Sequence, residues 1–148
     1  LTASTLPDKV AFATADVSFI SLGLVLAPIA STFRPEGGPI VALVKPQFEA
    51  GRGQVQGGVV RDPAVHRAVL ERVAGQAASL GLAPLDVIAS PILGPEGNRE
   101  FLLHAAVPAG WASGCDAVPD RPLPAALLER IAQVAAPAAS GAHAEAGA

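Results

Sequence analysis

Pro39-Ile40-Val41-Ala42-Leu43-Val44-Lys45 is an uninterrupted apolar run that ends in a lysine. Small and β-branched residues without polar alternation predict a strand that is buried on both faces, as in a parallel α/β sheet. Lys45 would then lie at the carboxyl end of this strand, the edge at which open α/β sheets bind their ligands. Two interpretations of Lys45 stay open here, because a lysine that only ends a strand and extends into water gives the same pattern.

The same arrangement occurs earlier in the chain, where a short apolar run at residues 10–15 ends in Asp16. Apolar residues at three- and four-residue spacing over residues 22–29 predict that a helix follows, with Ser18 or Ser21 as its N-cap. The chain therefore contains two strand candidates that each end in one ionisable residue.

A second helix and two further strands are predicted downstream. The helix begins at Asp62, which is followed by proline, and ends at Gly81, and these residue types are typical of the two positions. Strands at residues 85–90 and 100–105 have no helix between them, so we expect them to pair antiparallel or to lie as near neighbours. The predicted fold is a mixed α/β sheet in which parallel strands are closed by an antiparallel pair.

A glycine-rich stretch at residues 51–61 separates Lys45 from the second helix. It shows neither a helical nor a strand period, and loops of this length in compact domains are usually functional or mobile. We interpret it as an active-site loop. His66 lies near the edge of the apolar stripe of the following helix, and we expect it to be a half-buried helix residue.

The length of 148 residues and the hydrophobic content of 51% fit one domain with a tail. We divide the chain into a domain at residues 1–106 and an Ala/Pro-rich tail at residues 107–148, in which residues 124–135 could form a short helix. The chain contains no methionine and begins at Leu1, which suggests a piece of a longer protein. The single cysteine, Cys115, indicates a reducing compartment, and we expect a cytoplasmic protein.

The charge distribution is uneven along the chain. A net charge of −3 argues against a dedicated nucleic-acid binder, but five cations stand against three carboxylates between residues 45 and 72. Residues 17–30 are uncharged and largely apolar, yet these 14 residues are fewer than the roughly 20 that a membrane-spanning helix needs. We therefore reject a transmembrane interpretation.

Asp16, Lys45 and Glu100 are predicted to meet at one edge of the sheet. Asp16 and Lys45 end parallel strands, and Glu100 begins a strand that runs the opposite way, so the three residues lie at the same edge. Carboxylates can position a lysine, but two of them also favour its protonated form. A lysine with a reference pKa of about 10.4 is already a poor base at neutral pH, so an active base here would need a second cation.

Four short motifs occur in order along the chain. They are Ala15-Asp16-Val17-Ser18-Phe19-Ile20-Ser21-Leu22, Val44-Lys45-Pro46-Gln47-Phe48-Glu49, Gly57-Gly58-Val59-Val60-Arg61-Asp62-Pro63 and Gly94-Pro95-Glu96-Gly97-Asn98-Arg99-Glu100-Phe101-Leu102. Through these motifs, residues 10–104 resemble the C-terminal half of the TlyA/hemolysin A family, whose members are ribosomal RNA 2′-O-methyltransferases with an FtsJ-like (RrmJ-like) domain. The resemblance implies the C-terminal half of a Rossmann-like, S-adenosylmethionine-dependent methyltransferase fold.

The resemblance also implies a Lys-Asp-Lys-Glu catalytic tetrad, of which Asp16, Lys45 and Glu100 match the last three members. Asp16 would lie at the edge of the S-adenosyl-L-methionine pocket, and no metal is implied. In the implied mechanism, Lys45 is held by Asp16 and Glu100 and deprotonates a ribose 2′-hydroxyl, which attacks the methyl group of the cofactor. The first lysine and the main cofactor loop would lie upstream, so we expect the fragment alone to be inactive.

The implied substrate is ribosomal RNA within a ribosomal subunit. Arg52, Arg61 and Arg99 are candidates for RNA contacts, each with an exposed or structural alternative of equal weight. The chain departs from the family pattern at Gln56, where many relatives carry a lysine. Family members carry an S4-like RNA-binding domain upstream, which would reconcile an acidic chain with an RNA substrate.

Two other functions remain as alternatives. The first is a non-catalytic RNA-binding or ribosome-assembly module that keeps the fold. The second is membrane lysis, which the older family name suggests, but the sequence contains no amphipathic or spanning segment to support it.

Overall fold

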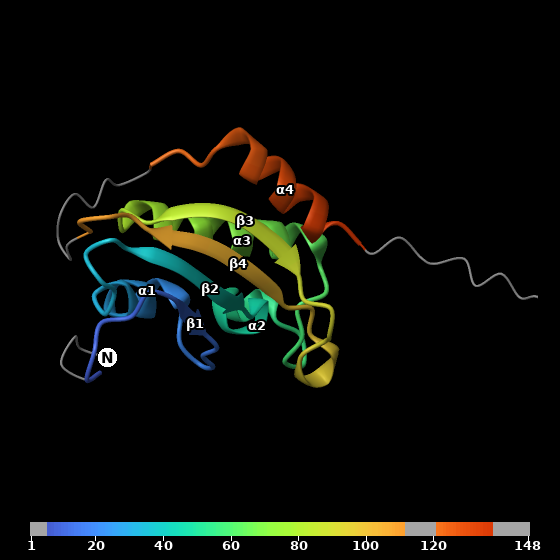
Figure 1. Cartoon of the computed structure of the whole chain (residues 1–148). Helices are drawn as coiled ribbons and strands as arrows, with labels where there is room; N and C mark the ends of the chain where they lie inside the picture. The colour runs from blue at the N-terminus through green and yellow to red at the C-terminus, as the bar shows by residue number, and fades with distance from the viewer. Residues whose placement is uncertain (1–5, 112–120, 138–148) are drawn as a thin grey trace, which may run out of the picture.

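Four strands form one sheet, in the order β1-β2-β4-β3 (Figure 1). The computed structural model describes residues 6–111 and 121–137, apart from the side chain of Arg52. Cys115 lies outside the described residues. The strands are β1 (Ala13–Ala15), β2 (Gly38–Val44), β3 (Ala83–Ala89) and β4 (Phe101–Val107).

The directions of the strands confirm the predicted mixed α/β sheet. β1 and β2 run parallel, whereas β4 runs antiparallel to both of its neighbours, β2 and β3. The predicted antiparallel pairing of the last two strands is therefore confirmed. β4 inserts between β2 and β3, so its first residue meets the last residue of β2, in the pair formed by Val44 and Phe101.

The first strand is shorter than the predicted range of residues 10–15. Only Ala13–Ala15 pair with β2. The backbone of Val10 instead bonds to the turn after the first helix, where its N–H donates to Thr32 O at 3.0 Å and its carbonyl accepts from Arg34 N at 2.9 Å. The apolar run is thus divided between two partners, a division that apolar periodicity does not reveal.

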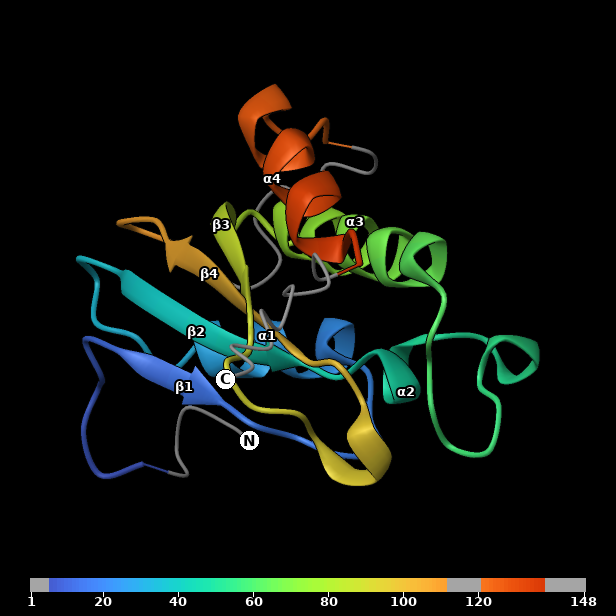
Figure 2. The same cartoon turned by 90° about the vertical axis from the view of Figure 1, so that its right-hand side faces the viewer.

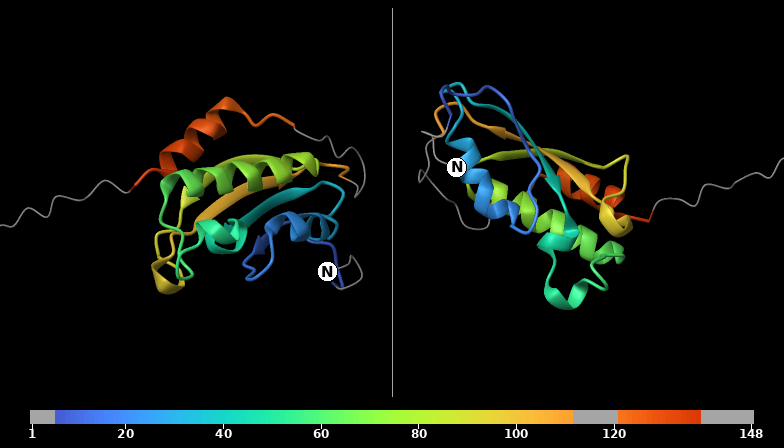
Figure 3. Two further views of the ribbon diagram at one scale, coloured as in Figure 1. Left: turned by 180° about the vertical axis from the view of Figure 1, so that it is seen from behind. Right: turned by 90° about the horizontal axis from the view of Figure 1, so that it is seen from below.

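Two helices, α1 (Leu22–Ala30) and α3 (Pro63–Ser79), cover one face of the sheet (Figure 3). Ser21, rather than Ser18, caps α1 by accepting a hydrogen bond from the first turn at 3.3 Å. Asp62 caps α3 in the same way at 2.8 Å, as predicted. No helix in residues 6–111 and 121–137 is long and apolar enough to cross a membrane.

The hydrophobic core lies between the sheet and these two helices. Along β4, buried residues alternate with half-buried ones, and the buried, core-facing residues are Phe101, Leu103, Ala105 and Val107. Burial alternates along β2 in the same way, and Val41 and Leu43 on its other face are only half-buried. The prediction that β2 is buried on both faces is therefore wrong for the described residues, among which helices cover mainly one face.

Short helices lie in the connections between the predicted strands and helices. α2 (Pro46–Glu49) follows Lys45 directly and begins with a proline, which suits the first position of a helix. One-turn 3-10 helices occupy Arg52–Gln54, inside the glycine-rich stretch, and Pro95–Gly97. Elements of three or four residues are too short for periodicity to reveal them.

The last described helix, α4 (Ala125–Ala135), packs against β3 and α3. Three of its side chains belong to the hydrophobic core: Leu127, Ile131 and Ala135. Arg130 Nε also joins α4 to β3 by donating to Asp86 Oδ1 at 3.2 Å. The division of the chain between residues 106 and 107 stays a prediction, but α4 shares the core of the sheet.

Candidate active site

The three residues predicted to meet at the carboxyl edge of β1 and β2 do meet there. Asp16 follows β1, Lys45 follows β2 and Glu100 immediately precedes β4. The pairing of Val44 with Phe101 brings Glu100 beside Lys45 on the neighbouring strand. Figure 2 views this edge, with α2 at the end of β2.

Lys45 forms an ion pair with Asp16, in which Nζ lies 2.6 Å from Oδ1. Nζ also donates a hydrogen bond to Ser18 Oγ at 3.1 Å. The side chain of Lys45 is 14% exposed and that of Asp16 is 68% exposed. The ammonium group is therefore shielded and fixed in direction, while the carboxylate keeps contact with solvent. An ion pair with one solvated partner contributes at most about 1 kcal/mol to stability, so its main effect is to orient Lys45.

Glu100 supplies a buried carboxyl group at the same edge. The residue is 6% exposed, and its Oε1 accepts a hydrogen bond from Gln47 Nε2 at 3.3 Å. The side chain lies against the backbone of Gly94, where a β-carbon would clash with the carboxyl group. Among the described residues, no ion pair joins Glu100 to Lys45 directly, and Gln47 links α2 to Glu100 instead.

Lys45 and Glu100 line a common cavity of about 290 Å³. Its walls come from the loop after β1, from α2, from the glycine-rich stretch at Gly58 and from the turn that contains Asn98. A larger cavity of about 890 Å³ lies between α1, α3 and residues 121–123, and none of the three predicted site residues lines it. We place the candidate site at the smaller cavity because the ionisable groups converge there.

An aromatic pair, Phe19 and Phe48, lies at the same cavity. The two ring centroids are 4.6 Å apart, and Phe19 is 89% exposed. Phe19 has a φ of 62°, a left-handed conformation that is rare for a bulky residue and that recurs at functional sites. Sequence reasoning did not single out these residues, although Phe is scarce in this chain and Phe19 lies three positions after Asp16.

Asn98 fixes the glycine-rich stretch beside the cavity. The residue is 2% exposed, and its Nδ2 donates to Gly58 O at 2.9 Å and to Pro95 O at 3.0 Å. Its Oδ1 accepts from Val60 N at 3.2 Å. The predicted active-site loop therefore reaches the cavity at Gly58, and Asn98 holds it there, a role that only the folded chain reveals.

The three candidate RNA-binding arginines differ in their surroundings. Arg99 donates to Ala136 O at 2.5 Å, just after α4, and its guanidinium lies 5.4 Å from the ring centroid of Phe101. These contacts match the alternative in which Arg99 has a structural role within the protein. Arg61 is exposed on the rim of a separate cavity of about 370 Å³, and the side chain of Arg52 lies outside the described residues.

His66 is more deeply buried than predicted, with 3% exposure. Its Nε2 lies 3.0 Å from Val60 O, and within the described residues Nδ1 has no hydrogen-bond partner. Its ring meets Phe101 edge-on at 5.4 Å. Burial lowers the pKa of His66 below 6.5, and the charge of Arg99 acts in the same direction, against the hydrogen bond to Val60. His66 is therefore a neutral donor to Val60 O at pH 7.

We expect acidification from pH 7 to pH 5 to destabilise the protein through His66. Because the folded pKa of His66 is lowered, the unfolded chain binds a proton more readily below pH 6.5, and stability falls as the pH falls toward the folded pKa. The contribution is at most about 1.4 kcal/mol per pH unit. Urea unfolding of the wild type and of His66→Gln, each at both pH values, measures it. Equal losses in the two proteins would contradict this role.

Comparison with protein families matches residues 2–107 to the FtsJ-like methyltransferase domain. The chain is 50% identical over 104 residues to the "Putative rRNA methyltransferase YqxC" of Bacillus subtilis. It is 44% identical over 104 residues to the "16S/23S rRNA (cytidine-2′-O)-methyltransferase TlyA" of Mycobacterium tuberculosis. Both matches cover 70% of this chain, which spans only 37% and 38% of the length of these two relatives.

A solved structure agrees with these matches. The crystal structure of a "putative hemolysin" from Lactococcus lactis superimposes with a TM-score of 0.73 at 36% sequence identity, and the match covers 90% of this chain and 60% of that one. The domain match covers residues 2–107 and so includes the edge that carries Asp16 and Lys45. The chain therefore belongs to the FtsJ-like methyltransferase family.

Proposed function

We propose that this chain is the C-terminal half of the catalytic domain of an S-adenosylmethionine-dependent ribosomal RNA 2′-O-methyltransferase. The observation that carries the proposal is the pairing of Lys45 with Asp16 at 2.6 Å, beside the buried carboxyl group of Glu100. An oriented lysine at the carboxyl edge of an α/β sheet is suited to moving a proton from a bound hydroxyl group.

In this proposal Lys45 removes the proton of a ribose 2′-hydroxyl. Asp16 and Ser18 hold the Lys45 amine in one direction, so that little orientational freedom is lost when the hydroxyl group binds. Glu100, held by Gln47, supplies a second acceptor at the cavity wall. An unperturbed lysine is a poor base at neutral pH, so the proposal includes a further cation near Lys45, and we assign this role to the first lysine of the family tetrad.

The residues present fit one part of an S-adenosylmethionine site. The carboxylate of Asp16 is solvated on its outer side, which suits the edge of a pocket for a cationic cofactor. When bound, the cofactor supplies an electrophilic methyl group. The chain spans 37% and 38% of two relatives, and we propose that the remaining length supplies the main cofactor loop and an S4-like RNA-binding domain.

Ribosomal RNA is the proposed substrate, as the name of the TlyA relative states for that protein. The pair of exposed Phe19 and half-buried Phe48 at the cavity supports an RNA substrate, since unstacked bases pack on aromatic side chains. Arg61 is exposed near the same loop and stays a candidate for a phosphate contact, as does Arg52. A ribosomal substrate also implies a cytoplasmic protein.

Cofactor binding separates this proposal from a non-catalytic RNA-binding module. We expect the full-length protein to bind S-adenosylmethionine in isothermal titration calorimetry and to transfer labelled methyl groups to ribosomal subunits. RNA binding without either property would favour the non-catalytic module. Leakage of liposomes without methyl transfer would instead favour a membrane-active protein.

A further inference from the structure

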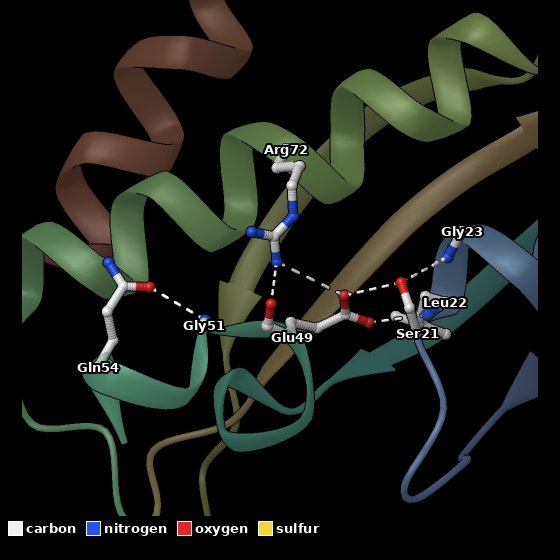
Figure 4. A network of polar contacts seen from close by, with 7 residues as sticks. All are labelled: Ser21, Leu22, Gly23, Glu49, Gly51, Gln54 and Arg72. Atoms are coloured by element: carbon white, nitrogen blue, oxygen red, sulfur yellow. Dashed lines mark hydrogen bonds and ion pairs between the residues drawn. The ribbon is translucent and has the colours of Figure 1, made fainter. Parts of the chain in front are cut away.

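Glu49, the last residue of α2, has a carboxylate that is almost completely buried, with 3% of the side chain exposed. Both of its oxygens are bound to the start of α1 (Figure 4). Oε1 accepts from Leu22 N at 2.7 Å, and Oε2 accepts from Ser21 Oγ at 2.9 Å. A carboxylate at this place also interacts favourably with the positive end of the helix. Glu49 therefore caps a helix that lies 27 residues earlier in the chain.

Arg72 of α3 completes the surroundings of Glu49. Its Nη2 lies 3.7 Å from Glu49 Oε2 and donates a hydrogen bond to the backbone oxygen of Glu49. A buried carboxylate is tolerated only when hydrogen bonds and opposite charge compensate for its lost hydration. Glu49 thus joins α1, α2 and α3 at one point, as Figure 4 shows.

The contacts of Glu49 extend a series that begins at Lys45. Residues 45–49 run alongside residues 16–22, and the two segments touch at three successive places. Lys45 contacts Asp16 and Ser18, the ring of Phe48 packs at a tilt against that of Phe19, and Glu49 binds the hydroxyl group of Ser21 and the backbone of Leu22. The loop that carries Asp16 is therefore fixed to the Lys45 segment at both of its ends.

We propose that Glu49 is a positioning residue for Lys45, an inference that rests on the function proposed above. Glu49 does not line the cavity of Lys45 and Glu100, so it does not touch the reacting groups. It acts through the loop instead: by holding residues 21 and 22, it keeps Asp16 and Ser18 within reach of the Lys45 ammonium group. Loss of the Glu49 carboxylate would release this loop and leave Lys45 less well oriented.

Chemical labelling of Lys45 tests the positioning role without any assay of activity. Lys45 and Lys9 are the only lysines of this chain, and Lys9 is exposed, so it serves as an internal reference. In the full-length protein, we expect Glu49→Ala to raise the rate of Lys45 acetylation by N-hydroxysuccinimidyl acetate severalfold, with Lys9 unchanged. Mass spectrometry of the peptides measures both rates. An unchanged ratio of Lys45 to Lys9 would overturn the proposal.

Steady-state kinetics provide a second readout. We expect Glu49→Ala to lower kcat on the order of 10- to 100-fold, with little change in KM, because misplacement of a catalytic group has effects of this size. If Glu49 acts through Asp16, adding Glu49→Ala to Asp16→Ala will lower kcat no further, whereas independent effects would multiply. Multiplying effects would contradict a route through Asp16.

Two controls separate positioning from general stability. Glu71→Ala removes a carboxylate of α3 that pairs with Arg67 at the surface, and we expect it to change neither labelling nor kcat. If Glu49→Ala does not fold, Ser21→Ala removes one of the two bonds to the carboxylate and keeps Arg72 in place, and faster Lys45 acetylation is again expected. A wild type without methyl transfer would refute the proposed function, while the acetylation ratio would still decide whether Glu49 positions Lys45.

Discussion

Lys45→Ala is expected to lower the rate of methyl transfer by the full-length protein on the order of 10²- to 10⁴-fold, the range of a lost general base. The amine would no longer reach the ribose hydroxyl, whereas Asp16, which is 68% exposed, would stay solvated. We therefore expect the variant to fold with nearly unchanged stability. Single-turnover transfer of labelled methyl groups to ribosomal subunits measures the effect, and circular dichroism checks the fold.

Two further lysine variants make this prediction more specific. Lys45→Arg keeps the positive charge but cannot give up its proton, so it should be as inactive as Lys45→Ala if Lys45 is a base. Lys9→Ala removes an exposed lysine that does not line the cavity and should be fully active. Substantial activity of Lys45→Arg would show that the charge matters and that the base lies elsewhere.

Phe101→Ala is expected to lower the free energy of unfolding by about 3–5 kcal/mol, as for other large-to-small changes of buried aromatic residues. Phe101 is 0% exposed at the start of β4, pairs with Val44, and packs against the ring of His66 and the guanidinium group of Arg99. The substitution would leave a cavity directly behind the strand ends that carry Lys45 and Glu100. Urea unfolding measures the loss.

Leu102→Ala is the matched control for Phe101→Ala. Leu102 is the next residue of β4, points to the opposite face of the sheet and is only half-buried. We expect a clearly smaller loss of stability, since less apolar surface returns to water. Equal losses in the two variants would contradict the assignment of the core to the face covered by α1 and α3.

The meeting of Asp16, Lys45 and Glu100 could be predicted because it depends on strand direction alone. Two apolar runs each end in one charged residue, and the sequence between the last two strands predicts no crossover helix, which indicates the direction of β4. The position of β4 next to β2 then brings Glu100 to Lys45. These signals are local in the sequence and need no knowledge of side-chain packing.

The partners of these residues could not be predicted in the same way. Ser18 suits a helix cap as well as a contact to Lys45, and the structure assigns the cap to Ser21. The left-handed backbone of Phe19 leaves no trace in the residue types around it. The bond from Glu49 to the start of α1 joins residues 27 positions apart, and such contacts depend on how α2 packs.

The burial of the sheet could not be predicted from the sequences of the strands alone. The apolar run of β2 is consistent with cover on both faces, but periodicity does not say which segments provide that cover. Among the described residues, α1 and α3 cover one face, and residues such as Leu85 and Ile88 of β3 are 52% and 42% exposed. The burial of His66 was underestimated for a related reason, since it comes from contacts with β4 and with Val60, which lie outside the apolar stripe of the helix.

The position of the transferred methyl group tests the central claim most directly. The full-length protein is incubated with ribosomal subunits and S-adenosylmethionine labelled in its methyl group, and the RNA is then hydrolysed with alkali. Alkaline cleavage needs a free 2′-hydroxyl, so a ribose methylated at that oxygen stays within an alkali-resistant dinucleotide. Our account predicts label in dinucleotides, and its loss with Lys45→Ala. Label in mononucleotides would show methylation of a base and would contradict a lysine that acts on the ribose 2′-hydroxyl.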